Sequence, residues 1–404
     1  MSEKKVNELE RLYEYYKRDL GHVYTAEEFG EKWGGPKYPK PFVGFNRWAT
    51  PDTITHFVDG IGDLNPLYRD ENYAKKTKYG CLIAPPCFLY SVWWAGTAID
   101  LVHGVHGWYS GSEWEWFRPI CEGDKINWKT IQPADVQFKT SAMAKKTLII
   151  YSEDEFTRQG GEVIAIHKAW VIHGERSEAV QKAKYAAIAK THEYSVEDIK
   201  KIHASQEREG IWGAAPRYWE DVAPGEELTP IVFGPLTMNE MLVWLIGGGN
   251  LMNKSDRIWR ILYDQHPDGD LGFFDPGIKI KLNLELPHLD NGLARQVGAP
   301  GAYDFGSQRI SCLGMLLTNW MGDDGFLWKF RAELRRFNII GDTTWCKGKV
   351  VRKYMDGGKC CVDIECWGEN QRGEMTIPGT ATIILPSREH GSVTYPLPRH
   401  IIKG

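Results

Sequence analysis

Residues 62–74 read GDLNPLYRDENYA, and the interpretation of the chain starts from this stretch. An aspartate, an asparagine and a proline fall within four residues, just before a helix-like YA. Asp, Asn and Pro favour turns, and the short side chains of Asp63 and Asn65 place polar atoms close to the backbone. The stretch therefore predicts a loop followed by a helix, with Asp63 as a candidate acid or base.

The chain appears to contain two copies of one unit. Three pairs of segments resemble each other and occur in the same order: 73–80 with 293–298, 116–126 with 335–345, and 160–172 with 372–384. The last pair reads GGEVIAIHKAWVI and RGEMTIPGTATII, and both copies look like a turn followed by an apolar strand. A common order of weak repeats predicts a tandem duplication.

The region between the two copies differs in composition from both. Residues 174–210 are rich in Lys, Glu and Ala, which favours a solvated helical linker. Ser195 with Asp198 forms a capping-box-like start for its second part. We therefore predict three parts: an N-terminal domain at 1–173, the linker at 174–210, and a C-terminal domain at 211–404.

Each half follows the same plan of elements. An apolar helical stretch is expected at 85–104 and again at 306–322, and β-rich runs such as KTLIIYSEDEF and KCCVDIECW follow. In the strand EWEWF the alternation places Trp114 and Trp116 on one face. One long apolar helix followed by antiparallel strands predicts an α+β fold in which a sheet wraps a central helix.

The pattern G-D-x-N-P-apolar-H-x5-A is the signature of R-specific enoyl-CoA hydratases and MaoC-like dehydratases. Residues 62–74 match it at Gly62, Asp63, Asn65, Pro66, Leu67 and Ala74, with Tyr68 in the histidine place. YGCLIAPPCFLY and GSEWEWFRPICEGDKI also resemble the N-terminal dehydratase domain of that family's two-hotdog members. PRYWEDVAPGEEL and HLDNGLARQVGAPGAYDFG extend the likeness to the second half. The resemblance implies a tandem double hotdog fold.

The second copy of the motif looks interrupted. GGGN at 247–250 stands where G-D-x-N is expected, with Gly248 in the aspartate place and Asn250 retained. An insertion at 251–287 follows, and the pattern resumes with Pro287, His288 and Ala294. Gly, Pro and Asp clusters in the insertion are typical of a loop, so we expect a lid or binding element near the second pocket.

The resemblance implies a hydro-lyase that interconverts 2-enoyl and 3-hydroxyacyl thioesters. In this family an Asp and a His hold one water, and backbone N–H groups at the start of the central helix hold the enolate-like oxygen. The predicted catalytic residues are Asp63, Asn65, His288 and Asp290. The predicted substrate-binding residues are Tyr68, Cys87, Asn250, Gly306, Ser307 and Arg309. A buried arginine such as Arg309 needs a carboxylate or a substrate anion nearby.

Three pairings of acid and base remain open. Asp63 and Asn65 can act with a histidine from outside the motif, for which the candidates are His56, His103 and His106. His288 can act with a carboxylate from outside the motif, for which the candidates are Asp290, Asp304 and Asp264, with His266 also in the insertion. Asp63 and His288 can act together, although a pseudo-twofold axis usually separates duplicated sites. The second pairing is favoured because His288 reappears at motif spacing after a long insertion.

Composition excludes several other classes. A net charge of −4 and a pI near 6.3 argue against a nucleic-acid binder. Neither an apolar signal region nor an 18-residue apolar run occurs, and the eight cysteines form no C-x-x-C pair, so a cytoplasmic protein without membrane contact is expected. Zinc, nucleotide and nucleophile-elbow motifs are absent, so neither metal nor cofactor is expected.

The expected partner is a thioester of coenzyme A or acyl carrier protein, and the chain is expected to be monomeric or to form a homodimer. Two further functions stay open. One is a catalytically degenerate subunit that binds acyl-CoA, and the other is a hotdog thioesterase.

Overall fold

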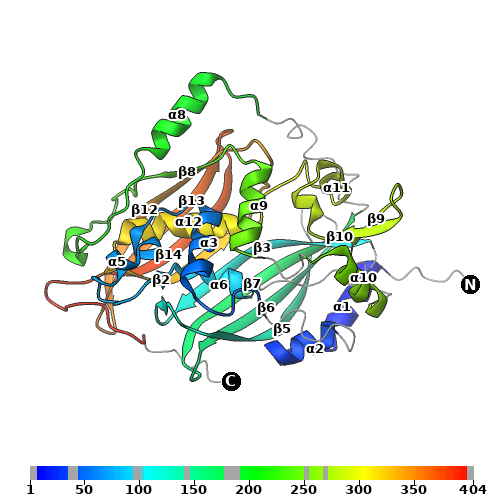
Figure 1. The fold of residues 1–404 in the computed structure, drawn as a ribbon, viewed down its shortest axis with the longest axis horizontal. Coiled ribbons are helices and arrows are strands. Elements are labelled where there is room, and N and C mark those ends of the chain that lie inside the picture. The colour runs from blue at the N-terminus through cyan, green and yellow to red at the C-terminus, as the bar shows by residue number, and fades with distance from the viewer. Residues whose placement is uncertain are drawn as a thin grey trace, which may run out of the picture.

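The computed structural model describes residues 7–34, 44–93, 102, 104–140, 146–176, 192–249, 254–266 and 272–397. The first-half strands are β1 (Val23–Thr25), β3 (Val105–Trp116), β5 (Ile126–Lys139), β6 (Thr147–Arg158) and β7 (Val163–Glu175). The second-half strands are β8 (Ile231–Phe233), β11 (Phe326–Glu333), β12 (Thr344–Asp356), β13 (Lys359–Asn370) and β14 (Met375–Ile384). Within the described residues these ten strands form one antiparallel sheet (Figure 1).

The two halves of this sheet have the same strand order. From the outer edge inwards the order is β1-β5-β6-β7-β3 in the first half and β8-β12-β13-β14-β11 in the second. Equivalent turns also match: Asp124 Oδ2 accepts from Cys121 N at 2.9 Å, and Asp342 Oδ2 accepts from Ile339 N at 3.1 Å. The predicted α+β tandem double hotdog is therefore confirmed.

The halves join where β3 pairs with β11. Glu113 lies opposite Arg331 and forms an ion pair with it at 3.0 Å on the exposed face. The next pair along the strands, Trp114 and Phe330, is buried on the other face. Trp114 also stacks on Trp116, with ring centroids 5.3 Å apart, as the alternation in EWEWF predicts. Charges on one face and aromatic rings on the other fix the register of this junction.

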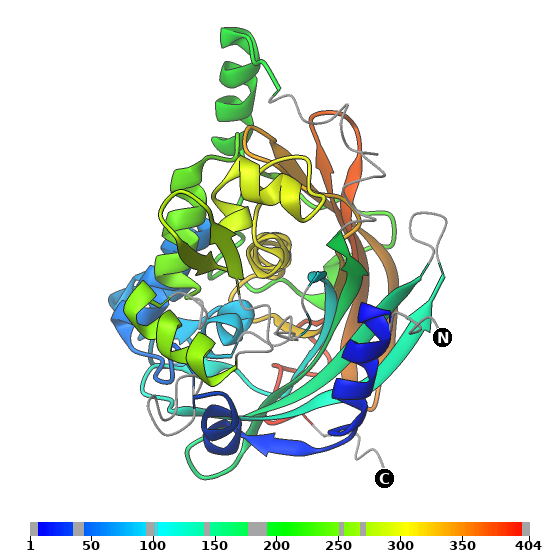
Figure 2. The ribbon, with the colours of Figure 1, turned by 90° about the vertical axis from the view of Figure 1, so that its right-hand side faces the viewer.

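A central helix lies in the concave face of the sheet. Helix α12 (Gly306–Met321) is buried at every residue from Ser307 to Met321, and Figure 2 shows it nearly end-on inside the curve of the strands. The predicted helix at 306–322 is thus confirmed. Its first-half counterpart is described only as the 3₁₀ turn η1 (Pro86–Phe88) and α6 (Leu89–Val92). The rest of the predicted helix at 85–104 falls partly on 94–101 and 103, outside the described residues.

Two equivalent helices, α3 (Pro51–Ile61) and α9 (Met238–Gly247), pack against each other. Each begins at a threonine whose side chain caps the first turn, Thr50 in α3 and Thr237 in α9. Their backbones approach closely, because a Cβ on Gly247 would lie 1.9 Å from the carbonyl oxygen of His56. Only glycine fits at this crossing.

Further elements complete the described fold. The helices also include α1 (Glu8–Lys17), α2 (Ala26–Gly34), α4 (Pro66–Arg69), α5 (Glu71–Ala74), α8 (Val196–Gln206), α10 (Asp256–Gln265) and α11 (Asn291–Gln296), with 3₁₀ turns η2 (Trp219–Asp221) and η3 (Leu286–His288). Short strands are β2 (Ile83–Ala84) with β4 (Ile120–Cys121), and β9 (Gly272–Asp275) with β10 (Ile280–Asn283). None of the helices in the described ranges combines the length and apolar character needed to cross a membrane.

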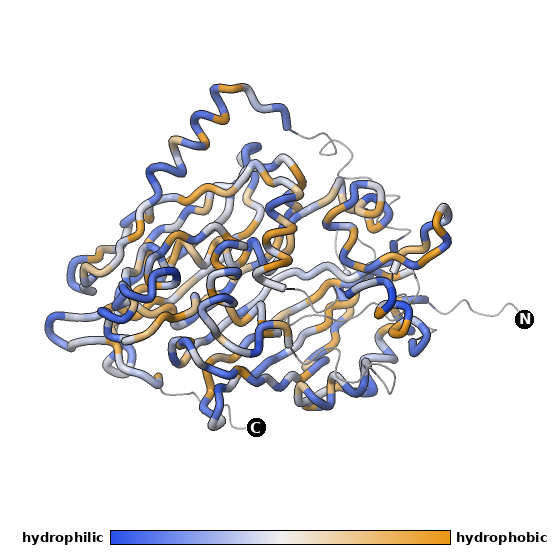
Figure 3. The backbone as a smooth tube through the Cα atoms, viewed as in Figure 1, coloured by the Kyte–Doolittle hydropathy of each residue, from blue (hydrophilic) through white to orange (hydrophobic). Residues whose placement is uncertain are grey.

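Helix α8 in the predicted linker is largely hydrophilic along its length (Figure 3). It starts at the predicted capping box, in which Ser195 and Asp198 each accept a hydrogen bond from the other's backbone N–H. Tyr194 attaches its start to the second half, because the phenol donates to the carbonyl oxygen of Gly341 at 2.9 Å. The limits of the three predicted parts stay predictions.

The insertion at 251–287 is more ordered than a loop, so that expectation is wrong for its described residues. It contains α10 and the β9–β10 hairpin, and α10 buries Trp259 and Leu262 at helical spacing. His266, which ends α10, places Nε2 2.9 Å from the carbonyl oxygen of Trp33 in α2. The insertion therefore packs on the N-terminal helices.

Replacement of Gly247 by alanine should destabilise the fold, because the new methyl group meets backbone rather than a movable side chain. Overpacking of this kind costs about 1–3 kcal/mol or more. Chemical denaturation of Gly247→Ala measures the loss. Gly210→Ala is the matched control, since a Cβ there meets nothing within 4 Å, and it should stay within about 0.5 kcal/mol of the wild type. An equal effect of both changes would contradict the close helix crossing.

Candidate active site

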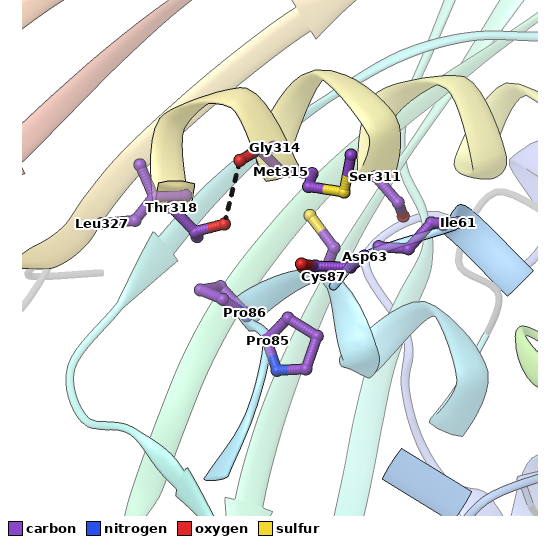
Figure 4. A pocket seen from close by; sticks show the side chains of 10 residues that line it. All are labelled: Ile61, Asp63, Pro85, Pro86, Cys87, Ser311, Gly314, Met315, Thr318 and Leu327. Atoms are coloured by element: carbon purple, nitrogen blue, oxygen red, sulfur yellow. Dashed lines mark hydrogen bonds between the residues drawn. The ribbon is translucent and has the colours of Figure 1, made fainter. Parts of the chain in front are cut away.

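Asp63 follows Gly62, the residue that caps the end of α3, and is fully buried. Its Oδ1 accepts a hydrogen bond from Asn65 N at 2.9 Å, whereas Oδ2 has no hydrogen-bond partner among the described residues. The side chain lines a cavity of about 10 Å³, where it lies beside Cys87 and opposite Ser311 and Met315 of α12 (Figure 4). A cavity of this size holds about one water molecule.

The environment of Asp63 is closed and weakly polar. Burial raises the pKa of its carboxyl from 3.8 to about 6, and Arg69 opposes the rise only in part. Tyr68, in the motif's histidine place, is 1% exposed, and burial together with the nearby Asp63 charge raises the pKa of its phenol well above 10. A phenol with so high a pKa cannot serve as a base near neutral pH.

Asn65 and Cys87 complete the first-half site. Asn65 caps α4, since its Oδ1 accepts from Leu67 N at 3.0 Å, so it orients the loop. Cys87 lines the same cavity as Asp63, and burial raises the pKa of its thiol to about 12, which keeps the thiol protonated. Thus Asp63 and Cys87 both line the space for one water, whereas Asn65 and Tyr68 belong to the adjoining loop and do not line it.

His288 belongs to the second copy of the motif and lies beside the start of α12. Its ring stacks on Phe305, the residue before α12, with centroids 4.1 Å apart. Nδ1 lies 2.8 Å from the carbonyl oxygen of Tyr303. A carbonyl only accepts, so Nδ1 carries the proton and Nε2 the lone pair. Burial lowers the pKa of His288 to about 4, so the imidazole is neutral at neutral pH.

The carboxylate nearest His288 is one that sequence reasoning missed. Glu285 Oε2 lies 3.7 Å from His288 Nε2, and both side chains are nearly buried. Asp290 is instead exposed and caps α11, where its Oδ1 accepts from Leu293 N at 2.8 Å. Asp264 is exposed and pairs with Arg260 at 3.5 Å. A signal for Glu285 existed, because it precedes His288 by the same three residues that separate Asn65 from Tyr68.

Arg309 and Asp304 form a buried ion pair behind the start of α12. Arg309 Nε donates to Asp304 Oδ2 at 2.7 Å, a second nitrogen bonds Oδ1, and Nη1 donates to the carbonyl oxygen of Arg336 at 2.6 Å. The guanidinium is therefore already held by protein groups, and the carboxylate expected near it is Asp304. This pair supports the position of α12 rather than offering a free cation to substrate.

The start of α12 is tightly enclosed. A Cβ on Gly306 would lie 2.5 Å from the Leu334 side chain and 2.6 Å from the Tyr109 ring, so a larger residue would require these side chains to move. Ser307 is fully buried, and its carbonyl oxygen accepts from Ser311 Oγ at 2.8 Å. The first N–H groups of a helix lack partners within the helix and carry its positive dipole end, so this start suits a developing oxyanion.

Asp63 and His288 lie at different turns of α12. The Asp63 cavity is lined by residues Ser311, Gly314, Met315 and Thr318 of that helix, and His288 stacks at Phe305. Phe305 is six residues from Ser311 and thirteen from Thr318, and at 1.5 Å per residue this is roughly 9 to 20 Å along the helix, which speaks against a joint site.

The described candidate histidines His56, His106 and His266 do not line the Asp63 cavity. His106 is buried and close enough to His288 to oppose its protonation, whereas His56 is exposed on α3. His103 and Asn250 lie outside the described residues. Within the described ranges, His, Cys, Asp and Glu form no group of three or more that could hold a metal ion.

The sequence of this chain resembles those of known proteins. Residues 46–167 match the model of the FAS1-like dehydratase domain region. A UPF0336 protein of Thermobifida fusca is 30% identical over 146 residues, which are 34% of this chain and 88% of that protein. The chain belongs to the UPF0336 family. A UPF0336 protein of Streptomyces avermitilis is 31% identical over 84 residues, 19% of this chain and 54% of its own length.

Solved structures resemble this UPF0336 member over most of its length. A MaoC-like dehydratase covers 91% of the chain and 99% of its own, with a TM-score of 0.60 at 14% identity. A MaoC domain protein dehydratase from Chloroflexus aurantiacus covers 91% and 96%, with a TM-score of 0.52 at 12% identity. At such identities the likeness shows the fold, and it agrees with the repeated strand order.

The raised pKa of Asp63 predicts a pH dependence of stability. Its stabilising contribution is full below about pH 3.8 and is lost as pH rises through about 6, since the folded state favours the protonated carboxyl. The whole shift corresponds to about 3 kcal/mol, at about 1.4 kcal/mol for each of about two pKa units. Between pH 5 and 7.5 the wild type should lose about 1–1.5 kcal/mol more than Asp63→Asn.

Urea denaturation at both pH values measures this difference. The control is Asp52→Asn, which removes an exposed carboxylate from the first turn of α3 and should keep the wild-type pH dependence. If Asp63→Asn also keeps it, the carboxyl is not buried as described.

Proposed function

We propose that the protein is a hydro-lyase that adds water to 2-enoyl thioesters, or removes it from 3-hydroxyacyl thioesters, at the second-half motif. The observation that carries this proposal is the position of His288. A neutral imidazole, with Nδ1 fixed on a carbonyl oxygen and Nε2 available as a base, lies beside the start of a buried helix. The dehydratase-type domain at 46–167 and the MaoC-like fold support the same class of reaction.

The chemistry follows from these groups. Water adds its oxygen to C3 of the enoyl chain, a proton is added at C2, and negative charge develops on the thioester oxygen between the two events. His288 Nε2 accepts a hydrogen bond from the water and orients it. The backbone N–H groups at the start of α12, around Gly306 and Ser307, stabilise the thioester oxygen. The acyl group is that of a coenzyme A or acyl carrier protein thioester.

The first-half site is less suited to this reaction. The residue in its histidine place is Tyr68, and the pKa of this phenol lies well above 10, so it offers no base near neutral pH. We propose that it does not turn over substrate and that the first half contributes mainly its part of the sheet. In this proposal the Asp63 carboxylate has a structural role, because its hydrogen bond from Asn65 N holds the conformation of the loop.

The test is an assay of the purified chain with crotonyl-CoA and longer 2-enoyl-CoAs. Loss of enoyl absorbance without release of thiol is the expected result. His288→Ala should lower kcat by about 10²–10⁴, the usual contribution of a positioned proton-transfer group. The comparison variant is Asp63→Asn, and a larger loss there than at His288 would move the reaction to the first half.

Two other outcomes of the same assay contradict the proposal. Release of free thiol would make the protein a thioesterase. Binding of acyl-CoA with neither reaction would make it a non-catalytic subunit. The exposed Glu389→Gln serves as an activity control, because its side chain is 82% exposed and far in sequence from the motif.

A further inference from the structure

The second copy of the motif is continuous once the hydrogen bonds of the two loops are compared. Residues 283–294 read NLELPHLDNGLA, and 63–74 read DLNPLYRDENYA. Asp63 Oδ1 accepts from Asn65 N at 2.9 Å, and Asn283 Oδ1 accepts from Glu285 N, also at 2.9 Å. The two turns are therefore equivalent, and Asn283 stands in the aspartate place.

The rest of the two loops repeats in step. The backbone N–H of Tyr68 bonds the carbonyl oxygen of Asn65 at 3.1 Å, and that of His288 bonds the carbonyl oxygen of Glu285 at 3.1 Å. Both helices that follow are capped by an aspartate, and both end the motif in a fully buried alanine. These residues are Asp70 with Ala74 in the first copy and Asp290 with Ala294 in the second.

This equivalence replaces the predicted assignment of Gly248 and Asn250. Gly248 is the C-terminal capping residue of α9, and Asn250 lies outside the described residues. In the turn at 283–285, as in the turn at 63–65, the side chain of the first residue accepts a hydrogen bond from the backbone N–H of the third. The insertion thus precedes the whole second motif and does not split it.

The comparison shows an exchange of two side-chain types. In the first copy the carboxylate is at 63 and the amide at 65, whereas in the second copy the amide is Asn283 and the carboxylate is Glu285. Asn65 uses its side chain to cap the helix that follows, but Glu285 makes no such cap to η3. The Glu285 carboxylate extends to His288 instead, 3.7 Å from Nε2.

The facing atoms of His288 and Glu285 both accept hydrogen bonds. Nδ1–H of His288 donates to Tyr303, so Nε2 offers a lone pair, and a carboxylate oxygen offers only lone pairs. Two acceptor atoms 3.7 Å apart do not hydrogen-bond to each other directly. A water about 2.8 Å from each atom fits this separation and donates one hydrogen to each. Its own lone pairs then point away from the protein groups.

We infer that Glu285 is the catalytic carboxylate of the second-half site and that, with His288, it holds the reacting water as a double donor. This rests on the proposed function. One O–H bond of the water breaks and its proton moves to the His288–Glu285 pair, while the water oxygen bonds to C3. The pair then delivers that proton to C2. Water is thereby added with no other reactant, and dehydration is the same sequence reversed.

The experiment measures enoyl-CoA hydration by Glu285→Gln, with Glu389→Gln as the matched control. Glu285→Gln should lower kcat by about 10² or more with KM within about threefold, because it removes one acceptor and its charge. The kcat of the double variant Glu285→Gln/His288→Gln should be no more than a few-fold lower than the kcat of the less active of the two single variants. The two groups act as a unit, so removing both costs little more than removing one. Urea midpoints of all variants show whether the fold is intact.

A second pair of variants tests the exchange itself. Glu285→Asn should lose activity as Glu285→Gln does. Adding Asn283→Asp should raise kcat at least tenfold again, because the double variant then has a carboxylate at 283 and an amide at 285, the order seen at Asp63 and Asn65. Failure to recover would show that 283 and 285 do not exchange roles. If Glu285→Gln keeps kcat within threefold while His288→Ala loses it, Glu285 is not catalytic but the proposed function stands. If the wild type hydrates no enoyl-CoA, the proposed function itself is wrong.

Discussion

The pairing of β3 with β11 is the interaction on which the rest of the molecule depends. It joins two five-stranded sheets within the described residues into one curved sheet, and α12 lies inside that curve (Figure 2). The junction has ion pairs such as Glu113–Arg331 on the outer face and the Trp114–Phe330 pair beneath. The inner rings are also the surface on which the central helix packs. A slip by one residue would turn charges inwards and leave α12 without its cover.

Because α12 is fixed in this way, each motif loop has a firm surface to pack against. Asp63 lies beside Cys87 and the middle turns of α12, and His288 lies on Phe305 at its start. The buried Arg309–Asp304 pair holds the helix start from behind. The two copies of the motif loop therefore have the same backbone turn but different side chains at the equivalent position. This position is Tyr68 in the first copy, and in the second copy it is His288, which lies beside Glu285.

Much of this architecture could be predicted from the sequence, because it depends on local periodicity and on repetition. Alternation placed Trp114 and Trp116 on one face, and a continuous apolar run marked α12. The repeats in common order indicated the double hotdog, and Ser195 with Asp198 indicated the start of α8. Each of these signals comes from residues close together in the chain.

The features that were missed depend on contacts that spacing does not encode. The Gly, Pro and Asp clusters around α10 favour a loop, although Trp259 and Leu262 have helical spacing. Glu285 was missed because Pro287 is shifted by one position relative to Pro66, which hid the ungapped match. Asp290 attracted attention as a carboxylate near His288, yet an aspartate at a helix start is equally a cap, and its exposed side chain serves that purpose.

The covalent link between the halves has one more consequence. Two separate hotdog subunits would have to find each other by collision, and their folded fraction would rise with concentration. Here β3 and β11 belong to the same polypeptide, so their pairing is intramolecular and does not depend on protein concentration. A substitution in one half then appears once rather than twice in the assembled unit, so the two motif loops can carry different side chains, such as Tyr68 in one and His288 in the other.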